Sequence, residues 1–464
     1  MKRKIYNRLL EWKEEQHGES AVLINGARRV GKSYIAKEFA QKEYKSYILI
    51  DFNIAGNNIK ELFENYLNDL DTFFMYLSSY ANTTLYPRES VIIFDEVQLF
   101  PRARTAIKYL VEDGRYDYIE TGSLVSIKKN VENIMIPSEE EEITMFPMDF
   151  EEFLWAMGNE TLMPLIRCNF EKKREMGQAM HRMAMDHFRQ YLITGGMPQA
   201  VAKYIETKDF DKVDHVKRQI LHLYRNDIQK YASTYAAKVT RIFDTIPSQL
   251  QRHEKKFMLK ALTEGARMRD YETSFFWLSD AMIVNMAYNT TEPSIGLGLN
   301  TDDTTLKCYM ADTGLLISHA FNEKEIVSGL YRKLLSDKLE YNGGMIVENI
   351  VAQMLRAAGH CLYFFSKYNK EKAEERMELD FLIAKNSITT RHNISPIEVK
   401  STSRYTLSSL NKCIAKYHNY LATPYVLHAA DIKIEEGIIS RPSEVKLPKN
   451  GRALALRGVR GMRG

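Results

Sequence analysis

A glycine-rich segment at residues 26–33 has the residue types and the spacing of a phosphate-binding loop. Gly26 and Gly31 flank four residues, and Lys32 and Ser33 follow directly. Because glycine has no Cβ, backbone N–H groups at these positions can approach phosphate oxygens closely. A lysine in this place can reach the β- and γ-phosphates, and the serine hydroxyl can be a ligand of Mg²⁺. The pattern G-x-x-x-x-G-K-S therefore predicts a site for a nucleoside triphosphate and Mg²⁺.

The segments that flank the loop support this prediction. An apolar run at 21–24 precedes the loop, and helical spacing runs from Tyr34 to Ala40 after it. Strand, loop and helix in this order are the context that a phosphate loop needs, whereas a glycine turn without function does not require them. The helix would direct the positive end of its dipole at the bound anion. We expect the nucleotide to contact Gly26, Ala27, Arg28, Arg29, Val30, Gly31, Lys32, Ser33 and Tyr34.

An acidic pair follows the apolar run at 91–94 and is expected to complete the nucleotide site. Asp95 would reach the Mg²⁺ shell through Ser33 or through a water, and Glu96 would orient the attacking water as a base. Acidic pairs after apolar strands are common, so this pair gains its meaning from the phosphate loop upstream. A solvated strand end is the alternative.

Hydroxyl groups end the next apolar run, at 116–120, where Thr121 and Ser123 flank Gly122. Either hydroxyl could hydrogen-bond the γ-phosphate or the attacking water, and we include Ser123 among the nucleotide-binding residues. A simple turn around Gly122 explains the same residues nearly as well.

A second group of ionisable residues includes Asp380 and Glu398, each on an apolar stretch of strand length. Lys400 follows Glu398 by two residues, which puts both side chains on one face of a strand. Two carboxylates could hold a divalent metal, and the lysine could orient or help to deprotonate water. Glu348, on an upstream helix, could complete the metal shell, or a neighbouring lysine could neutralise it. This set of residues predicts metal-dependent phosphodiester hydrolysis. The alternative is a domain with the same fold as such a hydrolase that binds a partner without cutting it.

The elements that must position these groups indicate an α/β protein. Apolar runs at 21–24, 47–51, 91–94 and 116–120 alternate with helical spacing, as at 57–80. This order predicts a parallel sheet whose functional groups lie at the C-terminal ends of the strands.

The middle of the chain is predicted to be helical and basic. Helical spacing dominates from about 150 to 235, after four glutamates at 139–142 that we expect in a solvated loop. Residues 211–270 carry 13 Lys and Arg against 7 Asp and Glu, and an apolar run at 306–310 predicts a returning strand. Basic helices closed by a strand pair suggest a winged helix, and a helical adaptor with a solvated basic face is an equal alternative.

Composition sets broad limits on the class of protein. The chain of 464 residues is long enough for several domains, and 45% hydrophobic with 27% charged residues is typical of globular proteins. The net charge of +4 decides nothing by itself. The 4 cysteines are widely separated without metal-ligand spacing, which fits a reducing compartment. We find neither a signal-peptide core nor an apolar run of membrane-spanning length, so a cytoplasmic location without a membrane partner is expected.

With these motifs in place, the chain resembles a family of bacterial and archaeal ATPases of the AAA class. The segments Gly195-Gly196-Met197-Pro198 and Asp312-Thr313-Gly314-Leu315-Leu316 are the ones that point to this family. Arg29 departs from the polar amide expected beside Arg28, which could alter how nucleotide is held. The resemblance rests on segments at 26–33, 94–98, 121–123, 195–198, 309–316, 347–349, 379–381 and 397–400.

The resemblance implies a domain order. It implies an AAA-type P-loop ATPase domain at 1–150, a helical lid region at 151–235 and a winged-helix-like domain at 236–335. A restriction-endonuclease-like domain of the PD-(D/E)xK type follows at 336–448, and a basic tail at 449–464 lies outside the family pattern.

Two hypotheses of function follow. The first is an Mg²⁺-dependent ATPase whose cycle acts on nucleic acid, DNA rather than RNA, with Lys32, Glu96, Asp380, Glu398 and Lys400 as catalytic residues. The second is a nucleotide-gated interaction protein, in which ATP is a conformational latch and the C-terminal fold only binds. The complete set of two carboxylates and a lysine favours the first, and a homo-oligomer is compatible with both.

Overall fold

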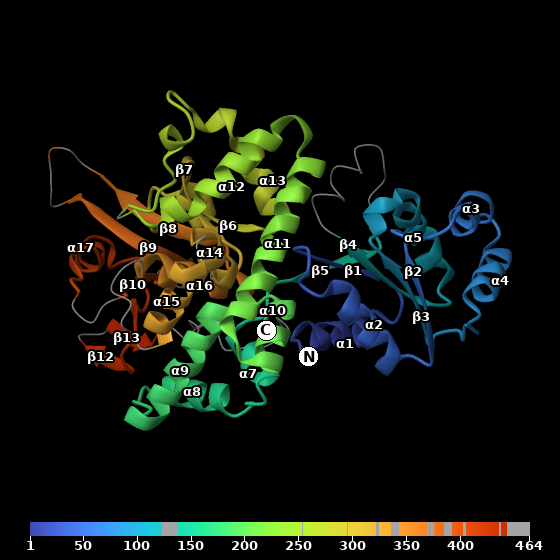
Figure 1. The fold of residues 1–464 in the computed structure, drawn as a ribbon, viewed down its shortest axis with the longest axis horizontal. Coiled ribbons are helices and arrows are strands. Elements are labelled where there is room, and N and C mark those ends of the chain that lie inside the picture. The colour runs from blue at the N-terminus through green and yellow to red at the C-terminus, as the bar shows by residue number, and fades with distance from the viewer. Residues whose placement is uncertain are drawn as a thin grey trace. The chain divides into compact units, whose positions relative to one another are not determined.

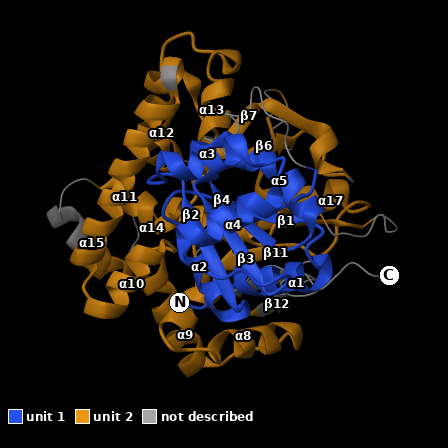
Figure 2. Ribbon diagram, turned by 90° about the vertical axis from the view of Figure 1, so that its right-hand side faces the viewer, with its two compact units in different colours: residues 1–146, 458–464 blue, residues 147–457 orange. Residues whose placement is uncertain are grey.

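A computed structural model describes most of the chain, and its described residues divide into two compact units (Figure 2). Unit 1 comprises residues 1–146 and unit 2 comprises residues 147–457. Among the described helices, none combines the length and the apolar character that crossing a membrane requires. The described residues are 1–122, 138–252, 254–294, 296–321, 324–335, 343–368, 371, 375–384, 392–401, 405–435 and 438–442.

Unit 1 is built on a sheet of five parallel strands in the order β2-β3-β4-β1-β5 (Figure 1). The inner strands are buried on both faces, which is why β1 and β3 consist mainly of apolar residues. The strands are β1 Ala21–Gly26, β2 Ser46–Asp51, β3 Ser90–Asp95, β4 Asp117–Gly122 and β5 Glu140–Met145. The helices are α1 Ile5–Gln16, α2 Lys32–Glu43, α3 Asn57–Asn65, α4 Leu70–Ala81 and α5 Pro101–Asp113.

Two hydrophobic cores lie on the opposite faces of this sheet. Helices α1 and α2 pack on the face that carries Val22 and Ile24 of β1. Helices α3, α4 and α5 pack on the face that carries Ala21 and Leu23. Successive residues of a strand point to opposite faces, so one apolar strand supplies both cores. The α/β fold with a parallel sheet that was expected for this part of the chain is confirmed.

Two expectations for unit 1 need correction. The stretch 57–80 is two helices, because the Asp69 side chain accepts a hydrogen bond from Thr72 N at 3.2 Å and begins a new helix there. The glutamates at 139–142 do not form a solvated loop, since residues 140–142 belong to β5, which pairs with β1. Arg104 neutralises Glu140 there, at 2.7 Å from Nη2 to Oε1. A neighbouring strand and an ion pair thus outweigh the low strand preference of glutamate.

Unit 2 begins with helices and ends in an eight-stranded mixed sheet of order β12-β13-β11-β10-β9-β8-β6-β7 (Figure 1). The helices before the sheet are α7 Phe150–Ala156, α8 Leu162–Glu171, α9 Gln178–Thr194, α10 Pro198–Thr207, α11 Phe210–Tyr231, α12 Ala236–Leu250 and α13 Glu272–Asp280. Those between or after strands are α14 Thr313–Ala320, α15 Lys324–Leu335, α16 Gly343–Ala357 and α17 Ser408–Tyr417.

The strands of this sheet come from both sides of the predicted domain boundary at 335/336. β6 and β7 form an antiparallel pair, and β6 also pairs in parallel with β8, where Ala287 lies beside Leu362. The regions predicted as winged-helix-like and as nuclease-like therefore share one sheet, and their assignment to those two folds stays a prediction. The strands are β6 Val284–Thr290, β7 Thr301–Met310, β8 Leu362–Lys367, β9 Met377–Ala384, β10 Ile394–Val399, β11 Tyr425–His428, β12 Lys433–Glu435 and β13 Ile438–Pro442.

Candidate functional site

The predicted phosphate loop lies where β1 ends and α2 begins. Gly26 has a φ of 154° and Gly31 a φ of 100°, which side chains with a Cβ rarely adopt. A Cβ on Gly26 would also collide with the carbonyl oxygen of Met145. The loop therefore passes close to the C-terminal end of the neighbouring strand β5, and its backbone conformation requires glycine at both positions.

The other residues predicted to bind nucleotide divide by exposure. Ala27 and Val30 are buried and anchor the loop, whereas the side chains of Arg28 and Arg29 are exposed. Tyr34 is 60% exposed on the first turn of α2. Arg29 has a φ of 69°, an unusual value for a residue with a side chain. Contacts of these three exposed side chains with a bound nucleotide stay predictions.

Lys32 folds back over the loop. Its ammonium donates hydrogen bonds to the carbonyl oxygens of Gly26, at 3.0 Å, and Ala27, at 3.1 Å. Burial lowers the pKa of Lys32, while Glu96 and Asp95 act in the opposite direction. Phosphate oxygens of a bound nucleotide could replace the two carbonyls as acceptors of the hydrogen bonds from this lysine.

The ends of three parallel strands converge beside this lysine. Ser33 Oγ donates to Asp95 Oδ1 at 2.7 Å, and the Thr121 hydroxyl donates to the same oxygen. Thr121 Oγ1 also accepts from the backbone N–H of Glu96 at 3.3 Å. The structure therefore brings together Ser33, Asp95, Glu96 and Thr121, and it supplies the hard oxygen ligands that suit Mg²⁺. Ser123 lies outside the described residues.

Gln98 is a residue of this site that the sequence did not single out. Its side-chain amide donates to Glu96 Oε2 and holds the carboxylate of the predicted base. Glu96 itself has a φ of 55°, and a left-handed backbone at a residue with a Cβ costs about 1 kcal/mol or more. Such strain is often found at functional sites. In the sequence, Gln98 stood at the end of the 94–98 segment of the family resemblance, two residues after the acidic pair, and no role was assigned to it.

The carboxylates predicted as the second centre lie on neighbouring strands of unit 2. β9 and β10 pair Phe381 with Ile397, which puts Asp380 beside Glu398. The backbone N–H of Val399 donates to Asp380 Oδ2 at 2.8 Å, and Lys400 Nζ donates to Glu398 Oε1 at 2.6 Å. The structure thus brings these three predicted residues together on one side of the sheet, as expected.

Of the two carboxylates of this centre, Glu398 is buried and Asp380 is partly buried, and their negative charges repel each other. Burial raises the pKa of Asp380, helped by the charge of Glu348, and burial raises the pKa of Glu398, helped by the charge of Asp380. Glu398 Oε2 is buried without a hydrogen-bond partner among the described residues. An unpartnered buried carboxylate oxygen fits a cation, so Asp380 and Glu398 could contribute to a metal site.

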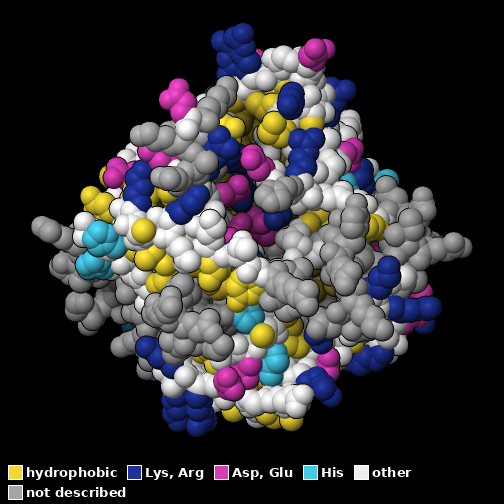
Figure 3. Space-filling view, turned by 90° about the vertical axis from the view of Figure 1, so that its left-hand side faces the viewer, with side chains coloured by type: hydrophobic (Ala, Val, Ile, Leu, Met, Phe, Trp, Pro, Cys, Tyr) yellow, Lys and Arg dark blue, Asp and Glu magenta, His cyan; other side chains and the backbone are white. Residues whose placement is uncertain are grey.

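Glu348 is placed differently from the metal ligand we predicted. Its Oε1 lies 3.2 Å from Lys307 Nζ and accepts a hydrogen bond from the Tyr309 hydroxyl, while its Oε2 accepts from Lys255. These contacts match the alternative in which a lysine neutralises this glutamate, and they do not fit a role in a metal shell. Acidic, lysine and arginine side chains gather around a hollow on one face of the molecule (Figure 3).

The two segments that pointed to an ATPase family contact each other in unit 2. Asp312 Oδ2 accepts from Gly196 N at 2.5 Å, and a Cβ on Gly314 would lie 2.6 Å from the Cα of Gly195. Gly195 has a φ of 79°, and a Cβ on Gly196 would lie 2.8 Å from Met148 N. These glycines allow three backbone segments to meet without side chains between them.

Polar side chains of α16 extend this contact. The Asn349 side chain accepts from Met310 N at 2.9 Å, and Gln353 Oε1 accepts from Thr313 N at 2.8 Å. Gln353 Nε2 donates to the Tyr191 hydroxyl at 3.1 Å. All of these groups are buried and hydrogen-bonded, so the motif residues hold α9, α14 and α16 together and have a structural role here.

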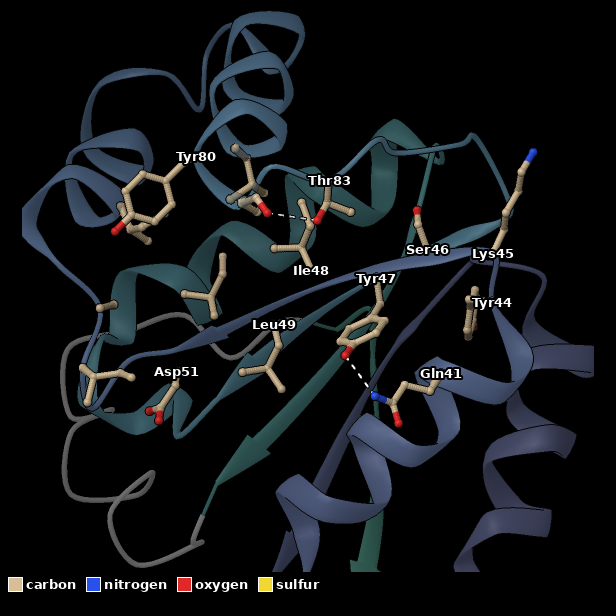
Figure 4. A pocket seen from close by; sticks show the side chains of 16 residues that line it. Gln41, Tyr44, Lys45, Ser46, Tyr47, Ile48, Leu49, Asp51, Tyr80 and Thr83 are labelled. Atoms are coloured by element: carbon tan, nitrogen blue, oxygen red, sulfur yellow. Dashed lines mark hydrogen bonds between the residues drawn. The ribbon is translucent and has the colours of Figure 1, made fainter.

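A groove of about 730 Å³ runs along the edge strand β2 (Figure 4). In the groove, Gln41 Nε2 donates to the Tyr47 hydroxyl at 3.2 Å, and Thr83 Oγ1 donates to the Ala81 carbonyl oxygen at 3.0 Å. None of the residues predicted to bind nucleotide is among those that line this groove. The groove is therefore separate from the phosphate loop.

Comparison with protein families identifies the first of the two units. Residues 18–154 match a family model described as an AAA domain. Together with the glycine loop, Lys32 and the bond between Ser33 and Asp95, this match defines an AAA-class P-loop ATPase domain. Residues 185–325 and 343–455 match models described as domains of unknown function, DUF8612 and DUF4143. A comparison with curated proteins found no match.

Solved structures give only distant likenesses. Cdc6p from Pyrobaculum aerophilum is 12% identical with a TM-score of 0.27, covering 73% of this chain and 96% of that chain. Drosophila ORC bound to DNA is 13% identical with a TM-score of 0.25, covering 66% and 91%. C. elegans PCH-2 is 11% identical with a TM-score of 0.22, covering 46% and 68%. At these TM-scores the likenesses carry no argument about function.

Proposed function

We propose that the protein is an Mg²⁺-dependent ATPase that couples ATP binding and hydrolysis to the binding or processing of nucleic acid through unit 2. The observation that carries the ATPase proposal is the hydrogen bond between Ser33 and Asp95, 2.7 Å long, beside the ammonium of Lys32. This bond joins the phosphate loop to the acidic strand end, which is the arrangement that Mg-nucleotide hydrolysis requires.

Each residue of unit 1 has a definite part in this proposal. Lys32 would bind the β- and γ-phosphates, and Ser33 and Asp95 would hold Mg²⁺, which when bound withdraws charge from the phosphates. Glu96 would accept the proton of the attacking water, with Gln98 holding the carboxylate in place. Thr121 fixes the Asp95 carboxylate and the Glu96 backbone at the same time.

Magnesium dependence tests this assignment most directly. We expect Ser33→Ala to raise the Mg²⁺ concentration for half-maximal ATP turnover by about 10- to 100-fold, because one oxygen that would hold the ion is lost. The measurement is phosphate release by the full chain across an Mg²⁺ titration. Ser79→Ala, on the exposed side of α4, is the matched control and should leave the titration unchanged. An unchanged Mg²⁺ titration in Ser33→Ala would refute the proposed metal site.

The nucleic-acid part of the proposal rests on the second centre and on charge. Asp380, Glu398 and Lys400 converge as metal-dependent phosphodiester hydrolysis would require, and Asp380 and Glu398 are the residues that would hold a divalent ion. The basic excess within 211–270 suits a polyanion, with DNA the expected polynucleotide. A second candidate function, in which unit 2 binds a partner without cutting it, is favoured by the lysines that hold Glu348.

A cleavage assay separates these two candidates. We expect Asp380→Ala to abolish any Mn²⁺- or Mg²⁺-dependent cutting of DNA and to leave ATP turnover intact, because the residue lies in the other unit from the phosphate loop. Asp303→Asn, an exposed carboxylate on β7, is the control and should change neither activity. Cutting that survives Asp380→Ala would exclude this centre as the nuclease. DNA binding without cutting by the unaltered chain would support the binding candidate.

A further inference from the structure

A buried lysine stands among the carboxylates of unit 2. Lys307 on β7 is 1% exposed, and its ammonium lies 3.2 Å from Glu348 Oε1, 3.2 Å from Glu378 Oε1 and 3.8 Å from Asp380 Oδ1. A surface ion pair usually joins one cation to one carboxylate, whereas this cation touches three. Its position is that of a shared counter-ion.

The surroundings of Glu348 complete this arrangement. Lys255 contacts its second carboxylate oxygen, and the Tyr309 hydroxyl contacts the first. Both oxygens of Glu348 are therefore occupied by protein donors. Within the described residues, no three His, Cys, Asp or Glu side chains come together in a way that could hold a metal ion.

Electrostatics explains why these carboxylates need a cation and why a metal ion would not bind beside the Lys307 ammonium. Glu348 is buried, and Glu378 and Asp380 are partly buried, so without a counter-charge these carboxylates must be protonated, paired with a basic side chain or bound to a metal. Here the basic side chain is already present. A divalent ion placed a few ångströms from the Lys307 ammonium would be repelled strongly at low dielectric.

We propose that Lys307 is a resident cation that takes the place of a metal ion among Glu348, Glu378 and Asp380, so that much of the negative charge in the centre of unit 2 is compensated without a metal. This inference deepens the proposed function, on which it rests for the assignment of this centre, and it favours binding over cutting by unit 2. Removing Lys307 would leave these hard oxygen ligands without a cation, and a shift of their side chains should then let a divalent ion bind among them.

Manganese binding to the full chain without nucleotide tests the proposal. The probe is Mn²⁺ alone, with free Mn²⁺ measured by electron paramagnetic resonance. We expect Lys307→Met to gain one bound Mn²⁺ per chain relative to the unaltered protein, and Lys307→Met combined with Asp380→Asn to lose it again. Lys255→Met, which removes a lysine that contacts only one of the three carboxylates, is the matched control and should gain no equivalent site.

Thermal unfolding gives a second readout. Lys307→Met should unfold at a lower temperature than the unaltered protein, and Mn²⁺ should raise the unfolding temperature of Lys307→Met by more than it raises that of the unaltered protein. If Lys307→Met does not fold, a comparison of Mn²⁺ binding by the unaltered protein and by Asp380→Asn still tests the proposal. Equal Mn²⁺ binding by these two supports the proposal, and an Mn²⁺ site in the unaltered protein that Asp380→Asn removes overturns it. Mn²⁺ at Ser33 and Asp95 is common to all variants, so failure of the ATPase proposal would not alter this comparison.

Discussion

Glu96→Gln is expected to bind ATP and to hydrolyse it about 10²- to 10⁴-fold more slowly than the unaltered protein. The amide keeps the shape of the carboxylate but cannot accept a proton from water. Lys32→Ala should behave differently, because it removes a cation that contacts the phosphates and therefore weakens binding as well as turnover. Turnover rate and the dissociation constant of a fluorescent ATP analogue, measured for both variants, separate the two effects.

Glu89→Gln provides the control for this pair of variants. Glu89 lies just before β3, its side chain is 59% exposed, and it pairs with Lys45 rather than with any residue of the loop. Its replacement should leave both the rate and the affinity unchanged. Parental turnover by Glu96→Gln would show that the acidic strand end does not supply the base.

Gly196→Ala is expected to destabilise unit 2 by about 3 kcal/mol, the upper end for overpacking a core. The added Cβ would lie 2.8 Å from Met148 N and 3.0 Å from Met148 C, and backbone atoms cannot move aside as a flexible side chain can. The hydrogen bonds of Gly196 with Asp312 and with Met148 would be strained in the same step. Urea unfolding followed by tryptophan fluorescence measures the loss, since Trp155 and Trp277 both lie in unit 2.

Gly329→Ala is the matched substitution in the same unit. Gly329 lies within α15, and a Cβ there would meet no atom within 4 Å. Because alanine favours helix by about 1 kcal/mol over glycine, this variant should be as stable as the unaltered protein or slightly more stable. Equal stability of Gly196→Ala and Gly329→Ala would contradict the close packing described for Gly196.

Local sequence patterns were sufficient to predict unit 1 and the parts of its site. The runs that became β1, β3 and β4 are buried on both faces, and such strands carry their signal within a few residues. The contact of Ser33 with Asp95 followed from the rule that parallel strands end at one edge of the sheet. The glutamates of β5 were expected in a loop because Glu140 is paired by Arg104, a partner on another element that no local pattern reveals.

The second centre was predictable only in part, again because some of its charged partners lie far away in the sequence. Glu398 and Lys400 are two residues apart, so strand alternation placed them on one face. Lys255 and Lys307 are 93 and 41 residues from Glu348 in the sequence, and only the folded chain brings them to it. The charge of a buried cluster is set by such distant partners. The sequence could therefore predict carboxylates that attract a cation, but not which cation is there.

The sheet that spans residues 284–442 also sets the order in which unit 2 can fold during synthesis. The hairpin of β6 and β7 can form once Met310 has left the ribosome, because its pairing is local. The other edge of β6 must wait for β8, since Ala287 pairs with Leu362. Until then that edge is open to pairing with another nascent chain. The pace of translation between these two strands should therefore influence how much soluble protein a cell obtains.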